Sequence, residues 1–189
     1  IKSWLHTNAM TRNALLASDI AKYKYKYVIF GGLWSYYTDL EQKNKIGPQP
    51  PRKNSVFFNG FENAIKFVIS HGAVPVIIQD VPPLLNISRF CGFARFSNDM
   101  NACANPFSRI QRRQADTYNF ILSLKRRFNK IILLDPRKVI CDKQKCYSQI
   151  QGVPLYMSGS LNSHLSAPGS AKIGNLYLHN IGNPFQRST

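Results

Sequence analysis

The order of the predicted elements places this chain in the α/β class, as a three-layer α/β/α sandwich built around a doubly wound, mainly parallel sheet. Three apolar runs that favour strands, residues 25–32, 73–83 and 130–136, alternate with patterns at helical spacing. Such alternation is typical of a parallel sheet with both faces covered, and right-handed crossovers put helices on each face. A length of 189 residues suits one domain, so we expect a single domain over residues 1–189.

The N-terminal part of the chain contributes the first strand and two helices. Apolar residues at helical spacing predict an amphipathic helix over residues 2–22. The β-rich run 25–32 ends in two glycines, which indicates a buried strand followed by a tight loop. Residues 42–55 are rich in Pro and Lys and predict a surface loop, and residues 61–72 predict a helix that Gly72 ends as its C-cap.

The rest of the chain supplies two further strands and two helices. The second strand, 73–83, is followed by a long irregular loop over 84–107. An amphipathic helix over 108–128, which Ser108 opens, precedes the third strand, and a last helix covers about 167–178.

Charge and hydropathy restrict the partners. The chain has 25 Lys and Arg against 9 Asp and Glu, a net charge of +16. Nucleic-acid binding is one interpretation of such a charge, but the cations are spread along the chain and no helix-turn-helix, zinc-finger or RNA-binding signature accompanies them. We therefore expect no nucleic-acid partner. The charge is better explained if the chain comes from a proteome of basic proteins or faces an anionic envelope surface. No apolar run approaches the roughly 18–20 residues of a membrane span.

The N-terminal sequence has neither the apolar stretch of a signal peptide nor an initiator Met. We therefore expect the chain to be a piece cut from a longer protein.

The four cysteines form two local pairs. Cys141 and Cys146 are separated by four residues, which is not a C-x-x-C spacing, and no histidine stands close by to complete a metal set. We expect no metal and no cofactor. Because all four lie in predicted loops, we expect disulfides Cys91–Cys103 and Cys141–Cys146 in an oxidising compartment; the alternative is four unrelated free thiols.

His164 is the best candidate for chemistry. In a doubly wound fold the functional crevice lies beyond the carboxyl ends of the strands, and the loop that carries His164 must return to that edge for its helix to pack. Pro168 suits the first turn of this helix, and we expect Ser166 to cap it. A histidine held there can act as general base for a serine hydroxyl; the alternative is a surface histidine with no role. His6, His71 and His179 are weaker candidates.

Four stretches of the sequence carry a family resemblance. They are "KYVIFGGLWSYY", "GAVPVIIQDVPPL", "LLDPRKVICDKQKCYSQIQGVPLY" and "PLYMSGSLNSHLSAPGSAKIG". The last resembles the terminal block of SGNH hydrolases, and more narrowly of the SGNH domain fused to acyltransferase-3 membrane proteins. The resemblance covers about residues 25–182.

This resemblance implies a three-layer α/β fold and an esterase-like site, with a serine from an early G-D-S motif and an Asp three residues before the histidine. In the fused proteins it implies acyl transfer, usually of acetyl, to envelope glycans such as lipopolysaccharide O-antigen or peptidoglycan. The implied partners are an acyl donor delivered by the fused membrane domain and an envelope glycan as acceptor. The implied location is the periplasmic face of the bacterial inner membrane.

The sequence departs from the family pattern at the catalytic positions. No G-D-S motif occurs in the 189 residues, so we expect an N-terminally truncated, partial domain that is inactive alone. Leu161 stands where the acid belongs. Ser158 and Asn162 are possible substitutes that orient the ring, although neither stabilises an imidazolium as a carboxylate does.

The loop after the first strand is the expected oxyanion or substrate loop. Gly31 and Gly32 allow a substrate to approach the backbone closely. Leu33 precedes Trp34 where the family has a polar side chain of the oxyanion hole, so we expect that side chain to be absent here. Trp34, Tyr36 and Tyr37 form either a sugar-stacking platform or ordinary core.

Two aspartates also lie at this edge of the predicted sheet. Asp80 is expected to cap a turn and Asp135 to cap a loop.

Two functions remain open. The first is O-acyl transfer to, or ester hydrolysis on, an envelope polysaccharide, with His164 as base for a serine outside this chain. The second is a catalytically decayed domain that binds glycan or acts as a scaffold.

Overall fold

A computed structural model describes residues 2–37, with side chains from Thr11 onward, and residues 56–83, 104–157 and 164–186. The order of its elements follows the predicted alternation of helices and strands. None of the helices in these ranges combines the length and the hydrophobicity that crossing a bilayer requires.

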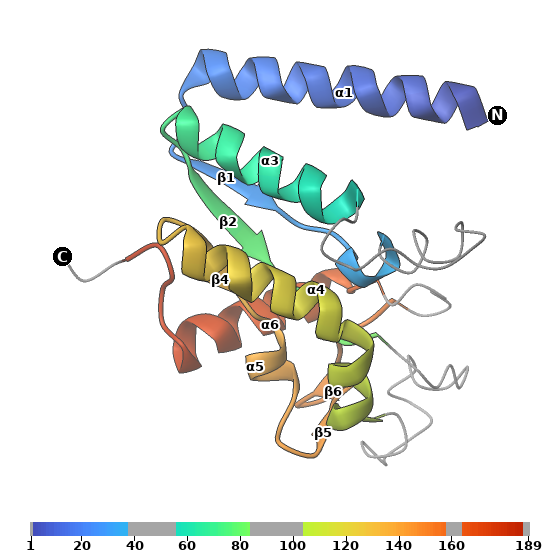
Figure 1. Cartoon of the computed structure of the whole chain (residues 1–189). Coiled ribbons are helices and arrows are strands. Elements are labelled where there is room, and N and C mark those ends of the chain that lie inside the picture. The colour runs from blue at the N-terminus through green and yellow to red at the C-terminus, as the bar shows by residue number, and fades with distance from the viewer. Residues whose placement is uncertain (1, 38–55, 84–103, 158–163, 187–189) are drawn as a thin grey trace.

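A sheet of three parallel strands forms the centre of the molecule (Figure 1). Its strands are β1 (Tyr27–Phe30), β2 (Val74–Ile78) and β4 (Ile132–Leu134), in the order β1-β2-β4. β1 and β2 are rich in β-branched and aromatic residues, which suit a pleated sheet, and β4 is wholly aliphatic. Parallel pairing on both sides of β2 confirms the α/β class expected from the sequence.

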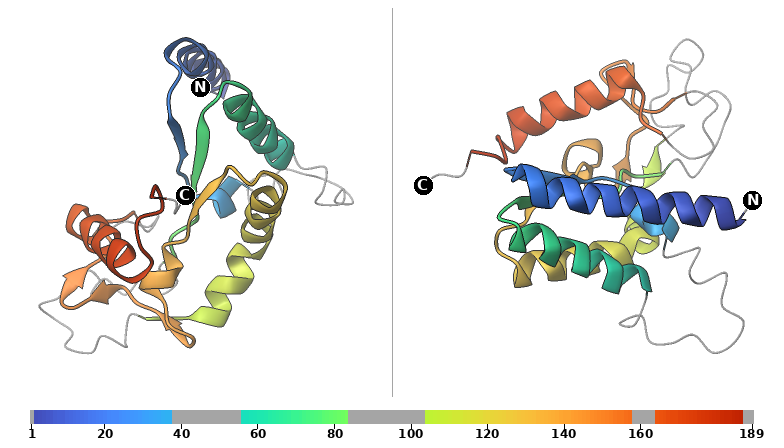
Figure 2. Two further views of the ribbon diagram at one scale, coloured as in Figure 1. Left: turned by 90° about the vertical axis from the view of Figure 1, so that its left-hand side faces the viewer. Right: turned by 90° about the horizontal axis from the view of Figure 1, so that it is seen from above.

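Helices lie on both faces of this sheet (Figure 2). One face carries α3 (Val56–Ser70) and α4 (Phe107–Arg127), and the opposite face carries α6 (Ala167–Asn180). The buried residues of α3 fall at helical spacing, so that one stripe of the helix meets the sheet. Ile65 of α3, Ile77 of β2 and Leu124 of α4 meet in the main hydrophobic core.

The ends of the helices only partly follow the sequence. Gly72 adopts φ +83° just after α3 and donates its N–H to the carbonyl of Ile69, as expected of a C-cap glycine. The expectation that Ser108 opens α4 is wrong: Phe107 is already helical, and no side chain caps its start. The reason is that the N–H of Phe107 donates instead to the carbonyl of Gln144, at 2.8 Å.

Several short elements were not predicted. The pair β3 (Asn105–Pro106) and β5 (Lys145–Cys146), the pair β6 (Gln149–Ile150) and β7 (Val153–Pro154), and the helix α5 (Arg137–Ile140) follow the carboxyl ends of the main strands. They enclose a second hydrophobic core, which consists of Ile110, Ile140, Cys146, Leu155, Tyr156 and Ile173. This core fixes the start of α6 relative to α4 and α5.

The first helix, α1 (Lys2–Tyr23), matches its predicted range closely. From Thr11 onward its residues are exposed or half-buried, including the large apolar side chains of Leu15 and Leu16.

Candidate active site

The loop after β1 is anchored by a carboxylate at the end of β2. Asp80 is 3% exposed and accepts two backbone N–H groups, from Trp34 at 2.6 Å and from Ser35 at 2.9 Å. Each of its oxygens accepts one of these bonds, so the carboxylate caps the first turn of the short helix at residues 34–37. Burial raises the pKa of Asp80, while the two backbone donors and the nearby Arg137 act in the opposite direction.

Trp34 is a buried anchor. Its side chain is 7% exposed, its indole N–H donates to the carbonyl of Ile78 at 2.8 Å, and its ring meets Phe61 edge-on at 5.0 Å. Of the two alternatives for Trp34, this burial favours ordinary core over a sugar platform, because its ring lies in the main hydrophobic core. Tyr36 and Tyr37 are each about half exposed.

The two glycines before Trp34 differ in their surroundings. A Cβ atom on Gly31 would meet no heavy atom within 4 Å, so open space lies beside its backbone. A Cβ atom on Gly32 would lie 3.0 Å from the indole ring of Trp34. Gly31 and Gly32 are both exposed, which suits the expected role of this loop in close approach to a substrate.

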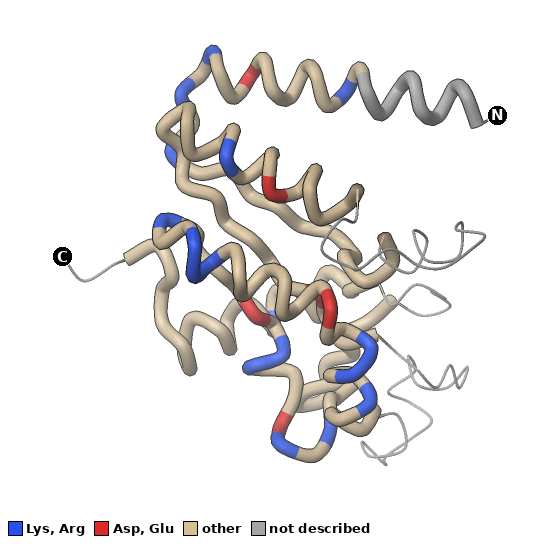
Figure 3. The backbone as a smooth tube through the Cα atoms, in the orientation of Figure 1, with Lys and Arg blue, Asp and Glu red and all other residues tan. Residues whose placement is uncertain are grey.

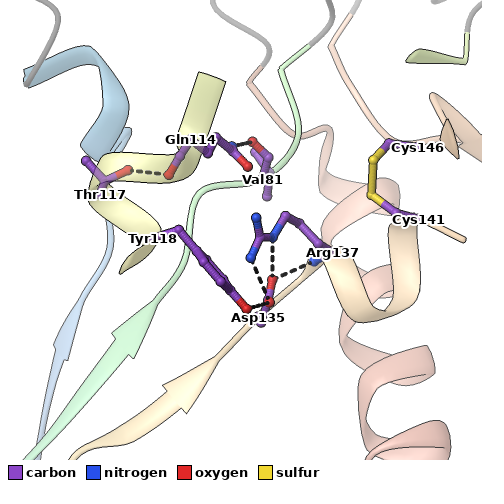
Figure 4. A network of polar contacts seen from close by, with 8 residues as sticks. All are labelled: Val81, Gln114, Thr117, Tyr118, Asp135, Arg137, Cys141 and Cys146. Carbon is purple, nitrogen blue, oxygen red and sulfur yellow. Dashed lines mark hydrogen bonds and ion pairs between the residues drawn. A yellow bond between two sulfur atoms is a disulfide. The ribbon is translucent and has the colours of Figure 1, made fainter. Parts of the chain in front are cut away.

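A second buried carboxylate follows β4 (Figure 4). Asp135 accepts two bonds from the guanidinium of Arg137, at 3.0 and 3.1 Å, and one from its backbone N–H. The hydroxyl of Tyr118 in α4 donates to Asp135 at 3.3 Å, and the guanidinium lies 3.6 Å from the centre of the Tyr118 ring. Asp135 therefore caps its loop as predicted. The buried ion pair with Arg137 was missed, because nothing in the sequence distinguishes this arginine from the other basic residues.

The segment that carries His164 returns to the same edge of the sheet. The carbonyl of His164 accepts from the N–H of Met157 at 2.8 Å, and the neighbouring Leu165 pairs with Tyr156. The buried Tyr156 hydroxyl in turn donates to the carbonyl of Pro82, at 2.6 Å. Because Pro82 follows β2 two residues after Asp80, this bond holds the His164 segment beside the carboxyl end of β2. The side chain of His164 is exposed.

The start of α6 is fixed by Ser166 and Gly169. The hydroxyl of Ser166 accepts from the N–H of Gly169 at 2.9 Å, which confirms it as the N-cap, and it donates to the carbonyl of Pro154 at 2.8 Å. Gly169 lies directly against the backbone of Leu155, since a Cβ atom there would be 2.6 Å from the Leu155 Cα and closer still to its oxygen. A side chain at this position would therefore force the helix or the Leu155 backbone to shift.

The structure joins Cys141 and Cys146 in a disulfide (Figure 4). The bond closes the loop between α5 and β5, with Cys146 in the second core. The expected Cys91–Cys103 bond, and the residues Ser158, Leu161 and Asn162, lie outside the described residues. Within the described ranges, no group of three or more His, Cys, Asp or Glu side chains has the arrangement of a metal site.

The arrangement combines an exposed imidazole with a loop whose backbone is open to a ligand, both at the carboxyl edge of a parallel sheet. Chemically, an exposed imidazole can transfer a proton, and an exposed glycine backbone allows close approach of a ligand. The loop and the His164 segment are both tied to residues that directly follow β2, through Asp80 and Pro82.

Comparison with known proteins identifies the fold family. The family model described as "SGNH domain (fused to AT3 domains)" matches residues 4–179. No curated protein and no solved structure matches the chain. The family match covers the strands, the loop after β1 and the His164 segment described above. The chain thus belongs to the family of SGNH domains that are fused to acyltransferase-3 domains, a context that indicates an acyl-transfer or esterase-like role and a membrane acyltransferase as partner domain.

Proposed function

We propose that this domain catalyses O-acyl transfer, with acetyl as the acyl group, to a cell-envelope polysaccharide such as lipopolysaccharide O-antigen or peptidoglycan, or hydrolysis of the same esters. His164 is the general base. The observation that carries the proposal is the return of the His164 segment, through the Tyr156–Pro82 hydrogen bond, to the edge where the glycine loop lies.

In this mechanism His164 takes the proton of a serine hydroxyl, and the serine oxygen attacks the carbonyl carbon of the acyl donor. The oxyanion that forms accepts N–H bonds from the backbone of the Gly31–Gly32 loop. His164 then gives the proton to the leaving group, which leaves an acyl-serine. In the second half His164 deprotonates a glycan hydroxyl or a water, whose oxygen takes the acyl group, and the proton passes to the released serine oxygen. Because no G-D-S motif occurs in these 189 residues, we place the nucleophile outside them.

The ring of His164 needs a partner that orients it. Leu161 occupies the position of the family acid, so Ser158 or Asn162 takes that role in our proposal. A hydroxyl or amide orients an imidazole but stabilises its cation less than a carboxylate, whose loss costs about 10⁴ in turnover in a serine triad. We therefore expect slow turnover.

We place the domain at the periplasmic face of the bacterial inner membrane, where the fused acyltransferase-3 domain delivers the acyl group. The net charge of +16 supports this setting, because envelope polymers and lipid headgroups are anionic. Figure 3 shows Lys and Arg spread over α1, α3 and α4 and over the segment that follows β4, so no single arm carries the charge.

Hydrolysis of p-nitrophenyl acetate by the full-length protein tests the catalytic role of His164. We expect His164→Ala to lower turnover by about 10²–10⁴, the usual contribution of a general base. His179→Ala is the matched control, because His179 is an exposed histidine in the last turn of α6, the helix that follows the His164 segment. Equal rates for wild type and His164→Ala would exclude His164 as the base.

A decayed domain that only binds glycan is the second candidate, and the sequence observation that favours it is Leu161 in the place of the acid. It predicts no turnover by the wild-type protein but retained binding to purified O-antigen or peptidoglycan fragments. Binding that is unchanged in His164→Ala, without any turnover, would favour this candidate.

A further inference from the structure

We infer that Asp80 is a positioning residue that fixes the Gly31–Trp34 loop in the geometry with which it meets the substrate. The inference rests on the proposed function, because it assigns to this loop the part that contacts the acyl group. It gives Asp80 a role beyond the turn cap that the sequence indicates.

The first step in the argument is the contact between Asp80 and the loop. Both carboxylate oxygens are used on consecutive N–H groups, those of Trp34 and Ser35, at 2.6 and 2.9 Å. These donors are 46 and 45 residues away in sequence, so the carboxylate joins the end of β2 to the segment after β1. Hydrogen bonds from backbone N–H groups to a buried carboxylate are among the stronger ones in proteins.

The second step is how this contact reaches the glycines. The bond to the Trp34 N–H and the indole bond to the Ile78 carbonyl hold both the backbone and the ring of Trp34 against β2. The ring then packs against Gly32, where even a Cβ atom would lie 3.0 Å away. Movement of Trp34 therefore moves the backbone of Gly32, and with it Gly31, whose surroundings are open.

The third step is the charge around Asp80. Its carboxylate is buried, and Arg137, itself buried and paired with Asp135, acts on it from the end of β4. If the loop moved away, the buried carboxylate would lose its two hydrogen-bond donors, and an unsatisfied buried carboxylate costs free energy. This cost favours a single loop position over a mixture of positions, which is what preorganised catalysis requires.

The test uses Asp80→Asn, which keeps one oxygen acceptor but turns an NH₂ group toward the second backbone N–H. In the full-length protein we expect kcat for p-nitrophenyl acetate to fall by about 10²-fold, as for a misplacement of roughly 1 Å, with a smaller change in KM. Val68→Ala is the control for lost stability, because Val68 is a buried α3 residue.

Tryptophan fluorescence reports the position of the loop independently of activity. This measurement uses the 189-residue chain, whose only tryptophans are Trp4 and Trp34, so a Trp4→Phe background isolates Trp34. Asp80→Asn should shift the Trp34 emission to longer wavelength and increase its quenching by acrylamide, and Val68→Ala should do neither. If Asp80→Asn does not fold, amide exchange in the wild-type protein replaces it: the Trp34 and Ser35 amides should be as protected as those of α3.

The outcomes separate the two proposals. An unchanged Trp34 signal, or rapid exchange of the Trp34 and Ser35 amides, overturns the anchoring by Asp80. A changed signal with kcat within about twofold of wild type shows that the anchored loop does not serve the reaction. If the wild-type protein has no turnover, the proposed function fails, and the catalytic part of the inference fails with it, while the signal still decides the anchoring.

Discussion

Gly169 is the residue at which α6 comes closest to its neighbour. Any side chain there would collide with the backbone of Leu155, and a backbone cannot move aside as the end of a flexible side chain does. The same turn holds the Ser166 cap, so a shift of the helix would also strain the bonds from Ser166 to Pro154 and from Gly169 to Ser166.

We therefore predict that Gly169→Ala lowers the free energy of unfolding by about 1–3 kcal/mol, the usual cost of overpacking. Urea unfolding at constant temperature measures it. Gly174→Ala is the matched control, since Gly174 lies in the same helix with nothing within 4 Å of an added Cβ atom. The control should gain up to about 1 kcal/mol from helix propensity; a loss of equal size in both variants would contradict the prediction.

At the scale of elements, the disulfide Cys141–Cys146 secures the short connection between α5 and β5. This connection has little regular structure of its own, and β5 consists of only two residues. The loop that the bond closes is short, so the chain-entropy estimate of its contribution is about 2 kcal/mol.

Reduction of this bond should lower the free energy of unfolding by that amount. We propose to compare urea unfolding with and without dithiothreitol in a Cys91→Ser, Cys103→Ser background, so that only Cys141 and Cys146 respond. The same background with Cys141→Ala and Cys146→Ala added should show no effect of the reductant. An unchanged midpoint on reduction of the first protein would show that the bond does not stabilise the fold.

The sequence predicts the long elements and misses the short ones, for a physical reason. Helices such as α3 and α4 show several turns of apolar spacing, whereas β3, β5, β6 and β7 have two residues each and carry no period at all. The start of α4 differs from the predicted one because the carbonyl of Gln144, distant in sequence, accepts the N–H of Phe107. Local sequence cannot reveal a partner at that distance.

The candidate site shows the same division. His164, Ser166 and Pro168 lie within one local block, and the sequence singles them out through turn chemistry and family resemblance. Asp80 looks like a turn cap in sequence, because its partners, Trp34 and Ser35, become neighbours only when β1 and β2 pair. The sequence also left the burial of Trp34 open, since an aromatic residue after a strand suits both a core and a binding surface.

At the scale of the whole molecule, charge is the dominant feature. An excess of sixteen positive charges repels itself in the compact state. The described residues include ion pairs of Glu62 with Lys66 and with Arg127, and of Asp135 with Arg137. Because 25 Lys and Arg stand against 9 Asp and Glu, screening should weaken repulsion more than attraction.

We predict that raising NaCl from 0.01 to 0.1 M, which shortens the Debye length from about 30 to about 10 Å, increases Tm. A gain of roughly 1 kcal/mol corresponds to about 2–4 °C for a domain of this size. Arg112→Gln with Arg113→Gln removes two exposed cations of α4, reducing the net charge from +16 to +14 (16 − 2). Its Tm should rise less with salt, and a Tm that falls with salt in the wild type would contradict the prediction.

The hydrogen bond from Tyr156 to Pro82 also has a consequence for how the molecule is made. Its two residues are 74 positions apart, and at a synthesis rate of about 5–20 residues per second several seconds separate their appearance at the ribosome. β1 and β2 can pair during that interval. The His164 segment cannot dock against them until it has itself been synthesised. The scaffold of the site therefore precedes its histidine in time, and assembly of the site is a late step in the folding of the domain.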